Sequence, residues 1–121
     1  RHEIGIGHHL VLHRGGGVAL SSAAPRNHVR PAVDVTFESA AEAYGRATVA
    51  VILTGMGSDG TAGAHRIKAA GGLVLAEAEE TCVVYGMPRS AADAGVVDAL
   101  VPLDDMAEAA ARMVHKAREL L

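Results

Sequence analysis

The sequence of 121 residues has one cysteine, three aromatic residues and no long apolar run. Because Cys82 has no second cysteine to pair with, a disulfide framework is excluded and a reducing, cytoplasmic setting is expected. No segment approaches the roughly 20 apolar residues that cross a bilayer and none resembles a signal peptide, so we do not expect membrane insertion. The net charge of −3 and the lack of stacking aromatics argue against a nucleic-acid partner.

The chain is instead rich in small apolar residues and contains 14 glycines. After residue 45, β-prone runs alternate with helical segments. The β-prone runs cover residues 48–53, 73–76 and 96–101, and the helical segments cover 61–70, 86–95 and the chain from 104 onwards. This alternation predicts an α/β fold, a doubly wound and mostly parallel sheet with helices on both faces.

The first 45 residues have a different pattern. Two short β-prone runs at 10–12 and 18–20 flank a glycine-rich turn, which predicts an early β-hairpin. Pro31 suits the first position of a helix, and Gly45 suits its end.

The turn Gly55-Met56-Gly57-Ser58-Asp59-Gly60 lies at the carboxyl end of a predicted strand, where ligands bind in parallel sheets. Asp59 could cap the following helix, with the glycines permitting positive φ angles. The turn could also cradle an anion, although it fits neither G-x-G-x-x-G nor the P-loop pattern. Ser58 could be the nucleophile of an elbow, with Met56 where the first glycine of G-x-S-x-G belongs. Finally, Asp59 could orient a histidine in a triad whose other members lie elsewhere.

Other candidate groups have simpler interpretations. The adjacent His8 and His9 point to opposite sides of a strand, and the seven histidines show no metal-binding spacing. We therefore expect scattered surface histidines and neither a metal nor a cofactor. Cys82 has no basic neighbour, which favours a small buried filler. Arg30 and Asp34, four residues apart, could pair along a helix.

Three segments carry a resemblance to a known family. They are RPAVDVTF at residues 30–37, VILTGMGSDGTAG at 51–63 and CVVYGMPRSAADAG at 82–95. In this order and at these separations they resemble the catalytic domain of the chemotaxis protein-glutamate methylesterase (CheB) family. The similarity extends from about His8 to Val114.

The resemblance implies a doubly wound α/β hydrolase that cleaves glutamyl methyl esters and deamidates glutamines on the cytoplasmic helices of methyl-accepting chemoreceptors. It makes Asp59 the acid of a Ser-His-Asp triad and gives the Met56 backbone N–H to the oxyanion hole. Gly55, Gly57 and Gly60 would support the turn that presents these groups. The family position that matches Ser58 is variable, which argues against the elbow.

Three expected parts are not found in the 121 residues. No G-x-S-[ST]-G run for the nucleophile and no Q-H-M-like run for the base occurs, and no receiver domain is recognisable. We therefore expect residues 1–121 to be a C-terminal portion of a methylesterase domain, without its first βα unit or units and inactive alone. The start at Arg1 also suggests part of a longer protein. The alternative is a non-catalytic α/β domain that binds a receptor or another partner and lacks the nucleophile segment.

Overall fold

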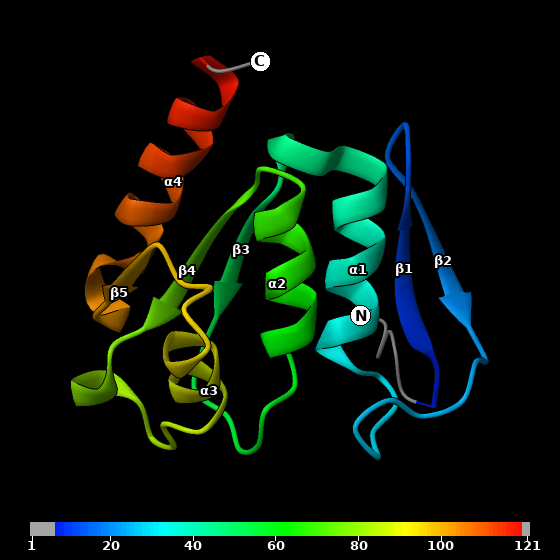
Figure 1. The fold of residues 1–121 in the computed structure, drawn as a ribbon, viewed down its shortest axis with the longest axis horizontal. Coiled ribbons are helices and arrows are strands. Elements are labelled where there is room, and N and C mark those ends of the chain that lie inside the picture. Colours follow the sequence, from blue (N-terminus) through cyan, green and yellow to red (C-terminus); the bar gives the residue numbers. More distant parts are fainter. Residues whose placement is uncertain (1–6, 120–121) are drawn as a thin grey trace.

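A computed structural model describes residues 7–119. The prediction that one portion of a domain spans residues 1–121 therefore stays a prediction for the residues at its two ends. Over the described residues the chain alternates strands and helices (Figure 1). The elements are β1 (His9–His13), β2 (Gly17–Ser21), α1 (Val33–Tyr44), β3 (Val49–Ile52), α2 (Thr61–Ala69), β4 (Leu73–Glu77), α3 (Met87–Asp93), β5 (Ala99–Val101) and α4 (Leu103–Glu119). Single turns of 3-10 helix occur at Gly45–Ala47 and Glu79–Thr81.

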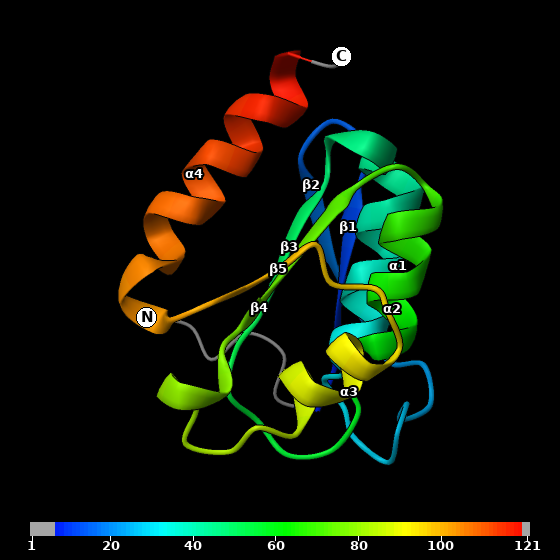
Figure 2. The ribbon, with the colours of Figure 1, turned by 60° about the vertical axis from the view of Figure 1, so that its left-hand side comes forward.

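The strands β3, β4 and β5 form a parallel sheet in that order. In Figure 2, α4 covers one face of this sheet while α1 and α2 cover the other. Because successive side chains of a strand point to opposite faces, β4 serves both layers. Val74 and Ala76 pack in the cluster that includes α2 and α3, and Leu75 packs against α4. The predicted α/β class with helices on both faces is confirmed.

The main core lies between the sheet and the α1–α2 layer. Ile52, Ile67 and Val74 are its largest fully buried members, each at most 1% exposed. Burying one such side chain contributes about 1.5–3 kcal/mol relative to leaving it in water. This packing fixes β3 and α2 relative to each other, and therefore fixes the two ends of the turn between them.

The predicted β-hairpin is confirmed, since β1 and β2 pair antiparallel. The hairpin is attached to α1 rather than to the parallel sheet (Figure 1). The Thr36 hydroxyl donates to the Leu10 carbonyl (2.7 Å), and the Tyr44 hydroxyl donates to the His13 carbonyl (3.0 Å). The hairpin therefore holds both ends of α1 in place.

The start of α1 differs from the prediction. Pro31 was expected at its first position, but α1 begins at Val33 after an extended Ala32 (φ −120, ψ 135). The first amides of the helix are bound by the distant Asp59 carboxylate, so the position of that carboxylate determines where the helix begins. The helix ends before Gly45, as predicted.

The last strand is shorter than the predicted run of residues 96–101, because only Ala99–Val101 pairs with β4. The Val96 N–H donates instead to the Ala91 carbonyl at the end of α3 (3.3 Å), and the Val96 side chain is buried in the main core. The apolar character of Val96 therefore reflects burial in a connection and not a position in the sheet.

Candidate active site

The turn at residues 53–60 leaves β3 at the carboxyl edge of the sheet and leads into α2. Gly57 (φ 83) and Gly60 (φ 99) lie in the left-handed region, where glycine has no steric penalty. Gly55 has a different role: a Cβ at this position would lie 2.7 Å from the Met87 sulfur, so the Met87 side chain would have to move. The three glycines therefore serve two purposes, backbone conformation and close packing.

The turn is braced by the segment before α3, so that residues some 30 positions apart lie together. The Gly55 N–H donates to the Val84 carbonyl (3.0 Å). The Gly55 carbonyl in turn accepts from the amides of Gly86 (3.0 Å) and Met87 (2.8 Å). Two of the three segments that carry the family resemblance are thus joined by backbone hydrogen bonds.

Met56 lies at the exposed part of this braced turn. The residue is 80% exposed. Its N–H donates to no acceptor among the described residues, whereas the neighbouring Gly55 amide is paired. The Met56 N–H is thus one of four consecutive amides, Met56 to Asp59, that have no acceptor among the described residues at this edge of the sheet.

Asp59 is half-buried and accepts three hydrogen bonds. Its Oδ2 accepts from the Val33 amide (2.7 Å), and its Oδ1 accepts from the Asp34 amide (3.0 Å) and from Asn27 Nδ2 (3.0 Å). The helix-cap interpretation of Asp59 is therefore wrong as stated. Asp59 does not cap the helix that follows it, since its three donors are Asn27, Val33 and Asp34 and none belongs to α2. It caps α1, which precedes it in the chain.

The first turn of α2 receives its cap from Asp34 of α1. Asp34 is 2% exposed, and its Oδ1 accepts from the amides of Gly60 (3.0 Å) and Gly63 (2.7 Å). These amides are therefore not free to bind an anion, which argues against the anion cradle. The predicted pairing of Asp34 with Arg30 is also wrong, because Arg30 donates to the carbonyls of Ser22 and Ala23.

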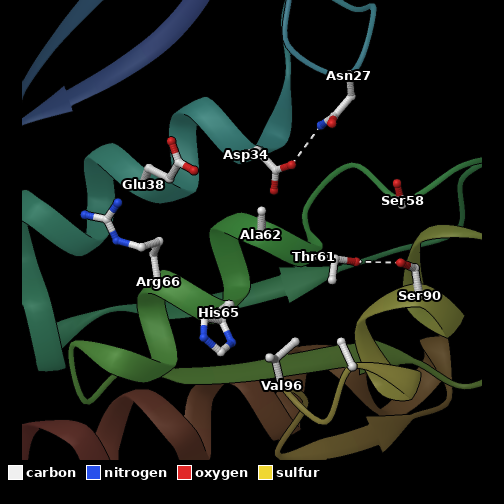
Figure 3. A pocket seen from close by; sticks show the side chains of 11 residues that line it. Asn27, Asp34, Glu38, Ser58, Thr61, Ala62, His65, Arg66, Ser90 and Val96 are labelled. Carbon is white, nitrogen blue, oxygen red and sulfur yellow. Dashed lines mark hydrogen bonds between the residues drawn. The ribbon is translucent and has the colours of Figure 1, made fainter.

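Asn27 connects the two carboxylates. Its Nδ2 donates both to Asp34 Oδ2 (2.7 Å) and to Asp59 Oδ1 (3.0 Å), and Figure 3 shows the first of these bonds. Sequence reasoning passed over Asn27 and gave Asp34 only a pairing with Arg30. Asp34 lies in the first turn of a helix, a common place for an acidic residue, and Asn27 lies in a polar connection without periodicity. Only their contacts with Asp59 distinguish them.

A surface groove of about 570 Å³ runs beside these residues, between α1, α2 and α3 (Figure 3). Asn27, Asp34 and Ser58 line it, and the hydroxyls of Thr61 and Ser90 meet in it at 2.7 Å. Ser58 is exposed and is not hydrogen-bonded to His65, which lines the same groove. Within the groove Ser58 therefore has no imidazole partner that could take its proton.

A buried carboxylate holds Thr54 near the start of the turn. Glu77, 1% exposed at the end of β4, accepts from the Thr54 amide (2.9 Å) and from the Thr81 hydroxyl (2.9 Å). Cys82 lies nearby and is half-buried, not fully buried as expected. Burial raises the pKa of the Cys82 thiol above its ordinary value, and the charge of Glu77 raises it further.

One histidine does not fit the expectation of surface positions. His9 is fully buried, its Nδ1 accepts from the Ala32 amide (3.2 Å), and its Nε2 lies 2.9 Å from the Ala24 carbonyl. An amide can only donate, so Nε2 carries the proton and donates to Ala24. Among residues 7–119 no three His, Cys, Asp or Glu side chains are grouped as metal ligands. Over the same residues, no helix is both long and apolar enough to cross a membrane.

Comparison with known proteins places this geometry in context. The family model described as CheB methylesterase matches residues 4–110. The chain is 51% identical over 120 residues to "Protein-glutamate methylesterase/protein-glutamine glutaminase 6" of Anaeromyxobacter dehalogenans, covering 93% of this chain and 33% of that protein. It is 49% identical to the "Protein-glutamate methylesterase/protein-glutamine glutaminase" of Geobacillus kaustophilus, covering 89% and 32%. The chain therefore spans about a third of the length of these relatives.

A solved structure gives the same result for the fold. The crystal structure of the Thermotoga maritima CheB methylesterase catalytic domain matches with a TM-score of 0.75 and 46% sequence identity. The match covers 95% of this chain and 59% of that one.

Proposed function

This chain belongs to the CheB methylesterase family, and we propose that it carries the acid and part of the oxyanion hole of a protein-glutamate methylesterase that is also a glutamine deamidase. The names of its relatives describe both activities. The substrates would be glutamyl methyl esters and glutamines on the helices of methyl-accepting chemoreceptors. The protein would act on them in the cytoplasm, without a cofactor.

The observation that carries the proposal is how many acceptor positions of the Asp59 carboxylate are occupied by hydrogen bonds. A carboxylate has about four acceptor positions, two on each oxygen. Two N–H groups occupy Oδ1 and one occupies Oδ2, so one acceptor position remains on Oδ2. In a triad the acid accepts the imidazole N–H, which fixes the tautomer and stabilises the charged form of the histidine. The remaining position on Oδ2 is the one we assign to that bond.

The unused Met56 amide supports the second part of the proposal. An N–H aimed at the developing oxyanion of an acyl-transfer reaction contributes roughly 3 kcal/mol to transition-state stabilisation in comparable sites. The hydrogen bonds of Gly55 to Val84, Gly86 and Met87 hold the adjacent peptide in place, so the donor is oriented before the substrate arrives.

The reaction also needs a nucleophile and a base, and the 121 residues contain neither a G-x-S-[ST]-G run nor a Q-H-M-like run to supply them. A serine would attack the ester carbon while a histidine takes its proton, and the tetrahedral intermediate would expel methanol after protonation by the same histidine. Water would then hydrolyse the acyl-enzyme. Because neither Asp59 nor Met56 attacks the substrate, residues 1–121 alone should release no methanol above a buffer control from methylated receptor.

A second candidate function is a non-catalytic domain that binds a receptor or another partner. The absence of a G-x-S-[ST]-G run from the 121 residues favours it. The coding sequence upstream of Arg1 discriminates between the two functions. A glycine-rich loop with a serine, followed by a histidine a few tens of residues later, supports the enzyme, and their absence supports the binding domain.

The test is Asp59→Asn in the complete protein, expressed from its full coding sequence. Asparagine turns one acceptor oxygen into an NH₂ that faces a backbone amide, so we expect a loss of roughly 1–3 kcal/mol of stability. As an acid of the triad, Asp59 should also be needed for the tautomer of the histidine. In a comparable hydrolase this exchange lowers kcat about 10⁴-fold, equivalent to about 5.5 kcal/mol.

Two measurements on the variant separate the roles of Asp59. A melting curve identifies a temperature at which Asp59→Asn is fully folded, and methanol release is measured there. If the folded variant loses less than about tenfold in rate, Asp59 is a helix cap alone and the proposed site is wrong.

A further inference from the structure

We propose that Asn27 is a positioning residue for Asp59, selecting which carboxylate oxygen is left open for the histidine of the triad. This inference rests on the proposed function. It starts from the two hydrogen bonds that Asn27 Nδ2 donates, one to Asp34 Oδ2 (2.7 Å) and one to Asp59 Oδ1 (3.0 Å). Asn27 itself touches neither substrate nor histidine in this scheme and acts only through Asp59.

Asn27 is presented by a tight turn. The Arg26 amide donates to the Val29 carbonyl and the Val29 amide donates to the Arg26 carbonyl, at 2.9 and 3.0 Å. The two residues between them, Asn27 (φ 56) and His28 (φ 65), both have positive φ, as a type I′ turn requires. Asparagine is among the residues that tolerate this conformation. The turn therefore projects the Asn27 amide toward the two carboxylates without help from a helix or strand.

The chemical effect of Asn27 follows from the acceptor positions. The backbone amides of Val33 and Asp34 occupy one position on each oxygen of Asp59. Asn27 takes the second position on Oδ1 and leaves Oδ2 as the single choice for an incoming N–H. Without Asn27, both oxygens would offer a free position, and water or the imidazole could occupy the wrong one.

Asp34 orients the Asn27 side chain. Its Oδ1 is already bound by Gly60 and Gly63, so only Oδ2 faces Asn27. The buried Asp34 carboxylate thus holds the Asn27 side chain in one orientation. Asn27 also places a donor between two carboxylates that would otherwise repel each other.

The experiment uses Asn27→Gly and its neighbour His28→Gly in the complete protein. Both residues are exposed and have positive φ, which glycine accepts without strain, so neither exchange distorts the turn. His28 forms no hydrogen bond with Asp59, which makes it the matched control. We expect Asn27→Gly to lower kcat about 10- to 100-fold with KM little changed, as for other residues that orient a functional group. We expect His28→Gly to leave kcat unchanged.

The kcat of the double variant, Asn27→Gly combined with Asp59→Asn, distinguishes an action through Asp59 from a purely structural role. If Asn27 acts through Asp59, adding Asn27→Gly to Asp59→Asn should lower kcat no further, because the effects of the two exchanges are coupled. Equal kcat for the two glycine variants, or a full additional loss in the double variant, would overturn the inference. If Asp59→Asn itself is fully active, Asp59 is not the acid of the triad. The inference about Asn27 is then wrong as well.

Discussion

Asp34, in α1, caps the start of α2, and Asp59, just before α2, caps the start of α1. The side chain of Asp34 accepts from amides at the start of α2, and the side chain of Asp59 accepts from the amides of Val33 and Asp34 at the start of α1. The caps are reciprocal across 25 residues of sequence, so the N-termini of the two helices are held as one unit. The two motifs at 30–37 and 51–63 are therefore parts of the same structure.

This relationship predicts the cost of removing Asp34. Asp34→Ala leaves the buried amides of Gly60 and Gly63 without an acceptor, and each such group costs about 1–3 kcal/mol. We expect about 2–6 kcal/mol less stability by urea unfolding of the complete protein. Asp34→Asn should lose less, because its remaining oxygen can still accept from both glycines. Asp93→Ala, at an exposed position of α3, is the control and should stay within about 0.5 kcal/mol. Equal stability of Asp34→Ala and Asp93→Ala would contradict the capping role.

The exposed Ser58 provides a prediction about the nucleophile. Ser58 lines the groove without an imidazole partner there, and the proposed reaction uses a serine from outside the 121 residues. Ser58→Ala in the complete protein should therefore leave methanol release within about twofold of the original rate, since surface exchanges have small effects. A loss of several hundredfold would instead support the elbow interpretation of this turn.

The buried His9 should be required for stability and not for chemistry. His9→Phe fills a similar volume but leaves the buried Ala32 amide without an acceptor, at a cost of about 1–3 kcal/mol. Urea unfolding of the complete protein should show this loss, while His13→Phe at the exposed end of the same strand should change stability little. A similar small change in both variants would show that the His9 hydrogen bonds do not matter for stability.

The Cys82 thiol should react slowly. Burial and the nearby Glu77 charge raise its pKa, so at a given pH less thiolate is present than in an ordinary cysteine. The rate of alkylation by iodoacetamide should therefore reach its midpoint at higher pH in the folded protein than in urea. Glu77→Gln should move that midpoint to lower pH, because it removes the charge and leaves burial in place. A folded protein that reacts as fast as the unfolded one across the pH range would contradict this.

The architecture was predictable because it follows from local patterns. Alternating apolar runs and glycine stops gave the order of strands and helices, and the glycine-rich turn between two β-prone runs gave the hairpin. Errors occurred where a distant partner replaced a local signal. Pro31 suited the first position of α1, yet the helix begins at Val33, where the Asp59 carboxylate meets its amides. Val96 suited a strand, yet it is buried beside α3.

The candidate site divides in the same way. The spacing of the family motifs singled out Asp59, Met56 and the glycines around them. The sequence could not identify the three donors to Asp59, which lie 25, 26 and 32 residues earlier in the chain. It also could not identify Glu77, whose carboxylate holds the Thr54 amide.

The sequence by itself thus determined the α/β class, the hairpin and the turn, because helix, strand and turn preferences depend on residues within a few positions of one another. Only the tertiary structure decided which helix Asp59 caps and which of its oxygens is left open. That decision depends on how closely α1 and α2 approach, at a point where a Cβ on Gly63 would lie 2.5 Å from the Phe37 side chain. Such contact brings the amides of one helix to the carboxylate of another, and no local preference encodes it.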